Sequence, residues 1–228
     1  MCVYCGHMLA WYDLVPVLSW LSLGGKCRYC RKSISWQYPV VELVTAALFI
    51  VSYLHWQYGF DTQGIVQLGF WIVFLTGFVA LVVYDLRWML LPDRIVRPLQ
   101  ILAGVYLLFV AAISQDVQIV LGAIWGVLFS AGLFYVLFQV SAGKWIGGGD
   151  VKLAVVLGTL IGGPVNALLM LFIASVFGSL VGLPLMLLGK AKRNTRIPFG
   201  PFLILATIIV YLFGASLIDF YKRQLLIA

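Results

Sequence analysis

The stretch that decides the fold of this chain reads YDLRWMLLPD and spans residues 84–93. It follows an uncharged apolar run at 66–84, which is long enough for a helix to cross the roughly 30 Å hydrocarbon core of a membrane. Asp85 stands where this run ends. Ionisable side chains at the edge of a membrane helix are costly, and they often have a functional role. The stretch therefore predicts a membrane-spanning helix that carries a carboxylate at one end.

The rest of the chain extends this pattern to a whole membrane protein. Of its 228 residues, 63% are hydrophobic and 10% are charged, and a mean hydropathy of +1.06 excludes an ordinary soluble domain. The apolar runs predict an all-α, polytopic integral membrane helical bundle, with spans near 38–56, 66–84, 95–114, 118–140, 165–188 and 199–218. A shorter run at 151–162 is a short or tilted span, or a half-helix buried among its neighbours. We expect about seven spans if it crosses the membrane and six if it does not.

The net charge of +7 is informative through its distribution along the chain. Two connections contain acidic residues but no lysine or arginine, whereas most of the basic residues lie in the alternate connections. Under the positive-inside rule the basic connections face the cytoplasm. They contain Lys26, Arg28, Arg31, Lys32, Arg87, Arg94, Arg97, Lys144, Lys152, Lys190, Lys192, Arg193 and Arg196. Lys222 and Arg223 break the pattern if seven spans cross. This orientation puts Asp85 and Asp150 at the cytoplasmic side.

All four cysteines lie within the first 30 residues, as Cys2-x-x-Cys5 and Cys27-x-x-Cys30. Each pair can chelate a metal, and four thiolates complete the tetrahedral shell of Zn²⁺. Two redox pairs or an iron–sulfur site are the alternatives, although a cytoplasmic location disfavours disulfides. We predict a small cytoplasmic zinc-binding module at residues 1–37. Its metal is structural, because four protein ligands leave no open position for a substrate.

A second carboxylate lies beside a glycine cluster, in the sequence GGGD at residues 147–150. Asp150 alone could simply cap the following helix, and Arg87 could simply neutralise Asp85. Asp93 is best explained as a turn or capping residue. The glycines favour a further role for Asp150, because irregular backbone at membrane depth is stable only inside protein or beside a water-filled cavity. Two carboxylates in one site share a proton, so that one can activate water while the other protonates the scissile amide.

Several motifs together resemble the type IV prepilin peptidases, which are membrane aspartyl proteases of the GxGD type. The matching segments are 2–42, with both cysteine pairs, 85–93, 147–153 and IPFGP at 197–201. The resemblance implies that Asp85 and Asp150 are the catalytic pair. It also implies that Gly147 and Gly149 are the glycines of GxGD, and that residues 38–228 form a membrane-embedded peptidase core.

The resemblance further implies an activity and a location. Members of this family cleave the basic leader from prepilins and pseudopilins at the cytoplasmic side of the bacterial inner membrane. Members with the cysteine module also methylate the new N-terminus with S-adenosylmethionine, so residues 1–37 are expected to be associated with methyl transfer. The residues that bind S-adenosylmethionine are not assigned. We expect prepilins and lipid as partners and no nucleic acid, and we expect that a span usually found ahead of the first cysteine pair is missing here.

Three other interpretations remain open at this point. An ion- or proton-coupled transporter could use the two aspartates as ligands, although transporters favour the midplane of the membrane and internal repeats. A zinc-stabilised scaffold of a pilus or secretion machine would need neither aspartate. A presenilin-like protease shares the aspartate motifs, but the cysteine module argues against it.

Overall fold

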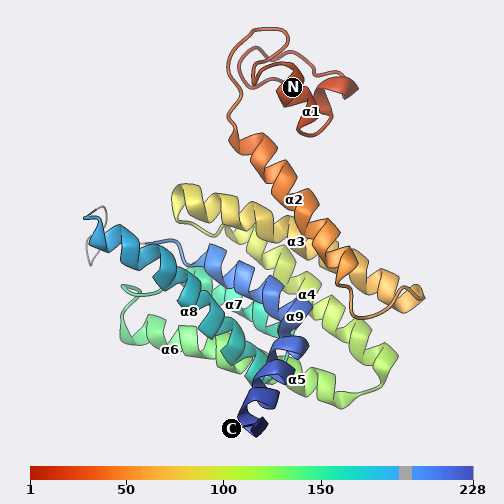
Figure 1. Cartoon of the computed structure of the whole chain (residues 1–228), viewed down its shortest axis with the longest axis vertical. Helices are drawn as coiled ribbons and strands as arrows, with labels where there is room; N and C mark the ends of the chain where they lie inside the picture. Colours follow the sequence, from red (N-terminus) through yellow and green to blue (C-terminus); the bar gives the residue numbers. More distant parts are fainter. Residues whose placement is uncertain (190–196, 228) are drawn as a thin grey trace. The chain divides into compact units, whose positions relative to one another are not determined.

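The computed structural model describes residues 1–189 and 197–227, and within it the chain forms two compact units, Met1–Leu54 and His55–Ala228 (Figure 1). The boundary lies at the end of the first membrane helix, Gln37–Leu54, so this helix belongs to the same unit as the cysteine module. The division of function at residues 37 and 38 stays a prediction. Four of the basic residues used to orient the chain, Lys190, Lys192, Arg193 and Arg196, lie outside the described residues.

The first unit is a small loop-rich module followed by one long helix. The module contains the 3₁₀ turn Trp11–Leu14, the short helix α1 (Leu18–Ser22) and an isolated β-bridge between Lys26 and Ser33. Helix α2 (Gln37–Leu54) follows it. The Val17 backbone N–H donates a 2.8 Å hydrogen bond to the Glu42 carboxylate, which joins the module to the first turns of α2.

The second unit is a bundle of helices. These are α3 (Thr62–Trp88), α4 (Asp93–Ser114), α5 (Val117–Val127), the π-helical turn η2 (Leu128–Gly132), α6 (Leu133–Val140), α7 (Gly148–Ile161), α8 (Pro164–Leu187) and α9 (Gly200–Ile227). Helices α5, η2 and α6 form one continuous segment, because the turn of π-helix widens the helix without ending it.

The described residues contain six helices that are long and apolar enough to cross a membrane. They coincide with the six long apolar runs of the sequence and confirm a helical, multi-pass membrane protein. The seventh, shorter run is helix α7, which has 14 residues. At 1.5 Å per residue it is about 21 Å long, which is shorter than the hydrocarbon core. Among the described residues the count of spans by length is therefore six, the lower of the two alternatives.

Helix α7 lies in the interior of the second unit, in contact with α4, α5, η2, α6 and α9. Its side chains Leu153, Ala154, Val156 and Leu157 are fully buried among these neighbours. Helix α5 crosses it where Gly126 meets Gly158, and a Cβ atom on Gly126 would collide with the Gly158 carbonyl oxygen. The Ser130 hydroxyl, in η2, then donates to the carbonyl oxygens of Gly126 and of Ala154 on α7. Close backbone contacts with its neighbours therefore fix the position of α7, which is too short to span the membrane alone.

Candidate active site and candidate metal centre

Asp85 lies in the last turns of α3 and is 5% exposed. Its carboxylate accepts a 3.1 Å hydrogen bond from the backbone N–H of Gly200, the first residue of α9. Arg87 does not neutralise it, because the Arg87 guanidinium lies over the Trp88 ring, 5.2 Å from its centroid. The ion pairs between described residues do not include one at Asp85. Asp85 is therefore a buried carboxylate without a basic partner in the part of the chain that the structure describes.

Asp150 lies in the first turn of α7 and is half-buried. The residue at the N-cap is Gly147, so Asp150 is not the capping residue that its position in the sequence suggested. The Asp150 N–H donates to the Gly147 carbonyl at 3.1 Å. A Cβ atom on Gly147 would stand 3.3 Å from the Asp150 carboxylate, so this glycine leaves one side of the carboxylate uncovered.

The fold brings the two carboxylates into one site. Asp85 and Asp150 belong to different helices and lie close enough for their charges to interact. Between their backbones lies Leu91, from the connection that follows α3. Ideal Cβ positions on Gly149 and Gly200 would stand 3.0 Å and 3.5 Å from its side-chain atoms. The two glycines therefore let α7 and α9 approach the same leucine, and this approach sets the aspartates near each other.

Asp93 is not a member of this pair. It is the first residue of α4, and its carboxylate binds the Lys152 ammonium at 2.7 and 2.9 Å and the Arg97 guanidinium at 3.1 Å. Gln100 adds a 2.9 Å hydrogen bond to the Lys152 carbonyl. These contacts join the start of α4 to the first turn of α7, next to Asp150. Sequence reasoning missed the role of Lys152, for which the only signal was its place in the third motif.

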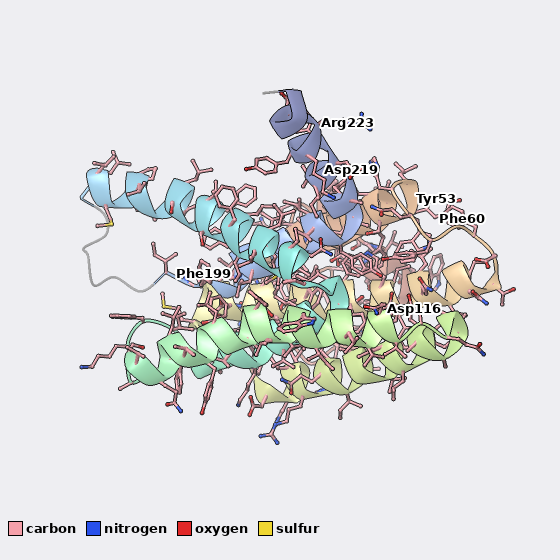
Figure 2. All side chains as sticks on the ribbon, turned by 90° about the horizontal axis from the view of Figure 1, so that it is seen from below. Tyr53, Phe60, Asp116, Phe199, Asp219 and Arg223 are labelled. Carbon is pink, nitrogen blue, oxygen red and sulfur yellow. The ribbon has the colours of Figure 1, made fainter. Side chains whose placement is uncertain are left out.

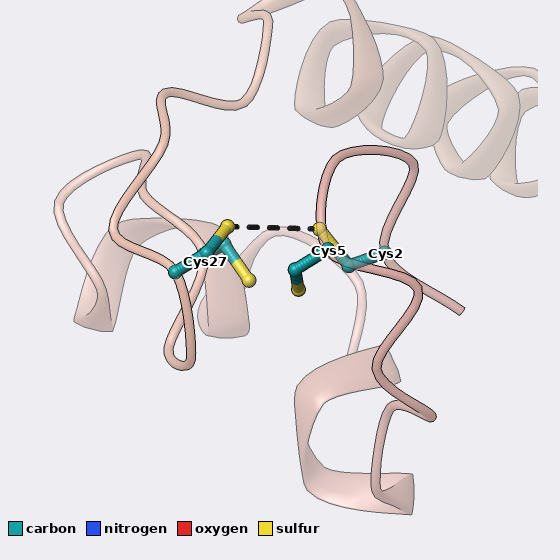
Figure 3. Close-up of side chains that lie close together, drawn as sticks. Cys2, Cys5 and Cys27 are labelled. Atoms are coloured by element: carbon teal, nitrogen blue, oxygen red, sulfur yellow. Dashed lines mark hydrogen bonds between the residues drawn. The ribbon is translucent and has the colours of Figure 1, made fainter.

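The four cysteines form a second cluster, in the first unit (Figure 3). Their sulfur atoms all lie within 4.8 Å of one another, and those of Cys2 and Cys30 are 4.0 Å apart. Zinc–thiolate bonds of about 2.3 Å require a sulfur separation of about 3.8 Å in a tetrahedron, so the donor set fits such an ion. The backbone N–H groups of Cys5 and Tyr4 lower the pKa of the Cys2 thiol to about 6, whereas burial and the neighbouring thiols raise the pKa of Cys30 to about 11. The cluster can hold a metal ion.

Polar and aromatic contacts surround this cluster. The Arg28 guanidinium binds the Asp13 carboxylate at 2.7 Å and holds the pKa of that carboxyl below its usual range. Tyr29 also donates to Asp13, and its ring packs against the His7 ring at a tilt of 32°, with the centroids 3.7 Å apart. These contacts link the segment after the first cysteine pair to the segment that contains the second pair. They support the loops from which the ligands project.

A multi-pass helical bundle in which carboxylates from the ends of two helices belong to one site is an arrangement that a membrane peptidase can use. Comparisons with known proteins identify the family. Residues 1–56 match the bacterial peptidase A24 N-terminal domain, and residues 72–183 match the type IV leader peptidase family. The chain belongs to the type IV leader peptidase family.

Several curated relatives are named prepilin leader peptidase/N-methyltransferase. The chain is 34% identical to the one from Pseudomonas aeruginosa, over 97% of this chain and 74% of the relative. It is also 34% identical to the one from Bacillus subtilis, over 99% and 86%, and 36% identical to the one from Xanthomonas campestris, over 96% and 73%. No solved structure matches the chain. Membership of this family confirms the resemblance seen in the sequence and favours a peptidase over a transporter.

Proposed function

We propose that this protein cleaves the leader peptide from type IV prepilins or pseudopilins, with Asp85 and Asp150 as the catalytic pair, and that it methylates the new N-terminus. The observation that carries the proposal is the pair itself: the buried carboxylate of Asp85 and the half-buried carboxylate of Asp150 come from different helices, α3 and α7, and belong to one site. The names of the relatives supply the substrate class and the second activity.

The chemistry of such a pair follows from the repulsion between like charges. Two adjacent carboxylates cannot easily both ionise, so one keeps a proton while the other is a base. The base removes a proton from water as its oxygen attacks the scissile carbonyl carbon, and the acid protonates the carbonyl oxygen. The resulting diol collapses: the protonated carboxyl gives its proton to the departing amine nitrogen, the ionised carboxylate removes a proton from one diol hydroxyl, and the C–N bond breaks. The site ends with one proton on the pair, as it began.

The location of the site follows from charge. Arg94, Arg97, Lys144 and Lys152 are exposed in the connections and helix ends near the two aspartates in the sequence. By the positive-inside rule these positions face the cytoplasm, and in a bacterium the membrane is the inner membrane. A prepilin would then be cut at the cytoplasmic surface, where its leader lies before export.

The cysteine module has a different role in this proposal. Zn²⁺ held by Cys2, Cys5, Cys27 and Cys30 would have no open ligand position, so it would stabilise the module at residues 1–37 without taking part in hydrolysis. S-adenosylmethionine would supply an electrophilic methyl group to the new amino terminus. The residues that bind it remain unassigned, and residues 38–228 form the peptidase core.

The test is cleavage of a purified prepilin by membranes that contain the full chain or its Asp85→Asn or Asp150→Asn variant. We expect both variants to lose cleavage, whereas Asp93→Asn, which changes a nearby carboxylate outside the pair, keeps it. Retained cleavage in either variant of the pair would overturn the two-aspartate mechanism. Labelled S-adenosylmethionine in the same assay tests the second activity, and a correctly cleaved product without label would exclude it.

A further inference from the structure

Gly200 begins α9 in the motif IPFGP, and its backbone is in direct contact with the aspartate pair. Its N–H donates to Asp85 Oδ2 at 3.1 Å, in a bond that joins residues 115 positions apart in the sequence. Gly200 is buried, so water does not compete for this hydrogen bond. The bond fixes one oxygen of the Asp85 carboxylate at the start of α9.

The N–H of Gly200 is free to make this bond because Gly200 is the first residue of α9. The first N–H groups of a helix have no partner within the helix and need acceptors from outside. Pro201 has no N–H, and the N–H groups of Phe202 and Leu203 both donate to the Phe199 carbonyl, at 3.1 Å. Gly200 therefore supplies the N–H of this first turn that reaches out of the helix.

The position also excludes any side chain. A Cβ atom on Gly200 would stand 2.6 Å from Asp85 Oδ2, 3.4 Å from its Cγ and 3.5 Å from Leu91 Cδ2. Gly200 does not have the positive φ that would require glycine for conformational reasons. The backbone thus suits other residues, and the obstacle to a side chain is the catalytic carboxylate itself.

We propose that Gly200 is a positioning residue of the aspartate pair: its N–H and its missing side chain hold the Asp85 carboxylate towards Asp150. This inference rests on the proposed role of the two aspartates. Leu91 completes the arrangement, because it lies against Gly149, next to Asp150, and against Gly200. The start of α9 and the start of α7 are therefore both set against one side chain, and Gly200 acts through Asp85 without touching the substrate.

The first test separates catalysis from binding in steady-state cleavage of a prepilin. Misplacing a catalytic group by about 1 Å can cost about a hundredfold in rate. We expect Gly200→Ala to lower kcat by about this factor and to change KM by less than about twofold, since the substitution leaves every other side chain unchanged. A KM that rises while kcat is unchanged would overturn the proposal.

Two glycines of α8 provide matched controls. Cβ atoms on Gly178 and Gly182 would stand 3.3 Å from Phe199 and from Ile197, so both press on the same segment without reaching Asp85. Phe199 lies beside α8 at the start of α9 (Figure 2). We expect Gly178→Ala and Gly182→Ala to keep kcat within about threefold of the wild type. A loss in these controls as large as in Gly200→Ala would mean that any disturbance of the segment has the same effect, and would contradict the proposal.

The second test needs no activity and remains valid if Gly200→Ala is unstable. The Tm of the full chain in detergent is measured for wild type, Gly200→Ala, Asp85→Ala and the double variant. If the new Cβ collides with the carboxylate, the Tm loss caused by Gly200→Ala disappears in the Asp85→Ala background. Equal losses in both backgrounds would overturn the proposal. Because this cycle measures contact and not hydrolysis, its result is distinguishable from a failure of the two-aspartate mechanism, which the Asn variants report.

Discussion

An aspartate lies at each end of α3, but one is exposed and the other is buried. At the start of the helix Asp61 is exposed and accepts a 3.0 Å hydrogen bond from the Gly64 N–H, within its own turn. At the end of the helix Asp85 is buried and bonds to Gly200, far away in the sequence. The first aspartate completes a local helix cap, and the second depends on the assembly of three helices. An aspartate next to an apolar run is therefore informative only when its partner is known.

The other exposed aspartate of this kind follows the same rule. Asp116 precedes α5 and accepts a 2.8 Å hydrogen bond from the Gln118 N–H. A capping aspartate satisfies N–H groups of its own helix and can be understood from a few residues of sequence. Asp85 and Asp150 do not cap, and their environment is set by α7 and α9.

The largest effect on stability and cleavage is expected from a substitution at the crossing of α5 and α7, where Gly126 meets Gly158. Gly126→Ala places a Cβ atom against the Gly158 carbonyl, and overpacking of this kind costs about 1–3 kcal/mol or more. Because α7 carries Asp150, we expect the variant to lose both thermal stability and prepilin cleavage. Thermal unfolding in detergent and the cleavage assay measure the two losses. Gly104→Ala is the control, since nothing lies within 4 Å of a Cβ atom there. A stable and fully active Gly126→Ala protein would show that the position of Asp150 does not depend on this crossing.

A smaller effect is expected at the capped end of α3. Asp61→Ala removes the acceptor of the Gly64 N–H, and loss of a helix cap costs about 1 kcal/mol. Cleavage should be unchanged under conditions where the protein is folded, because the cap lies at the opposite end of a helix of 27 residues. Thermal unfolding and cleavage are measured on the same sample. A large loss of cleavage with an unchanged Tm would contradict the contrast between Asp61 and Asp85, because Asp61 would then have a functional role.

The smallest effect is expected at the ion pairs beside the site. Asp93→Asn weakens the contacts with Lys152 and Arg97, which are exposed to solvent and screened by salt. We expect a lower Tm than that of the wild type, with a change smaller than for Asp61→Ala, and a difference that shrinks at high salt. Thermal unfolding at low and high ionic strength checks it. A loss larger than that of the cap would show that the pair has an essential part in joining α4 to α7.

Much of the fold could be predicted from the sequence because its signals are local. Each long apolar run became one helix, since in lipid a segment must satisfy its own backbone hydrogen bonds. The two cysteine pairs also met as expected, because chelating pairs with turns between them can close over a short distance. The capping interpretation of Asp150 was wrong, because Gly147 occupies the N-cap. The sequence also contained no measure of how deeply α7 is buried.

By itself, the sequence determined that this protein is a helical membrane protein with a four-thiolate cluster and two unusual carboxylates, since length, hydropathy and spacing act over short stretches of chain. The motifs already pointed to Asp85 and Asp150, but only the tertiary structure brings these two carboxylates into one site. Close contact between Gly126 and Gly158 fixes the position of the short helix α7, and the start of α9 makes a hydrogen bond with Asp85. The contact between Gly200 and Asp85 is the clearest case, because close approach between distant backbones depends on how helices pack and leaves no periodic trace in the sequence.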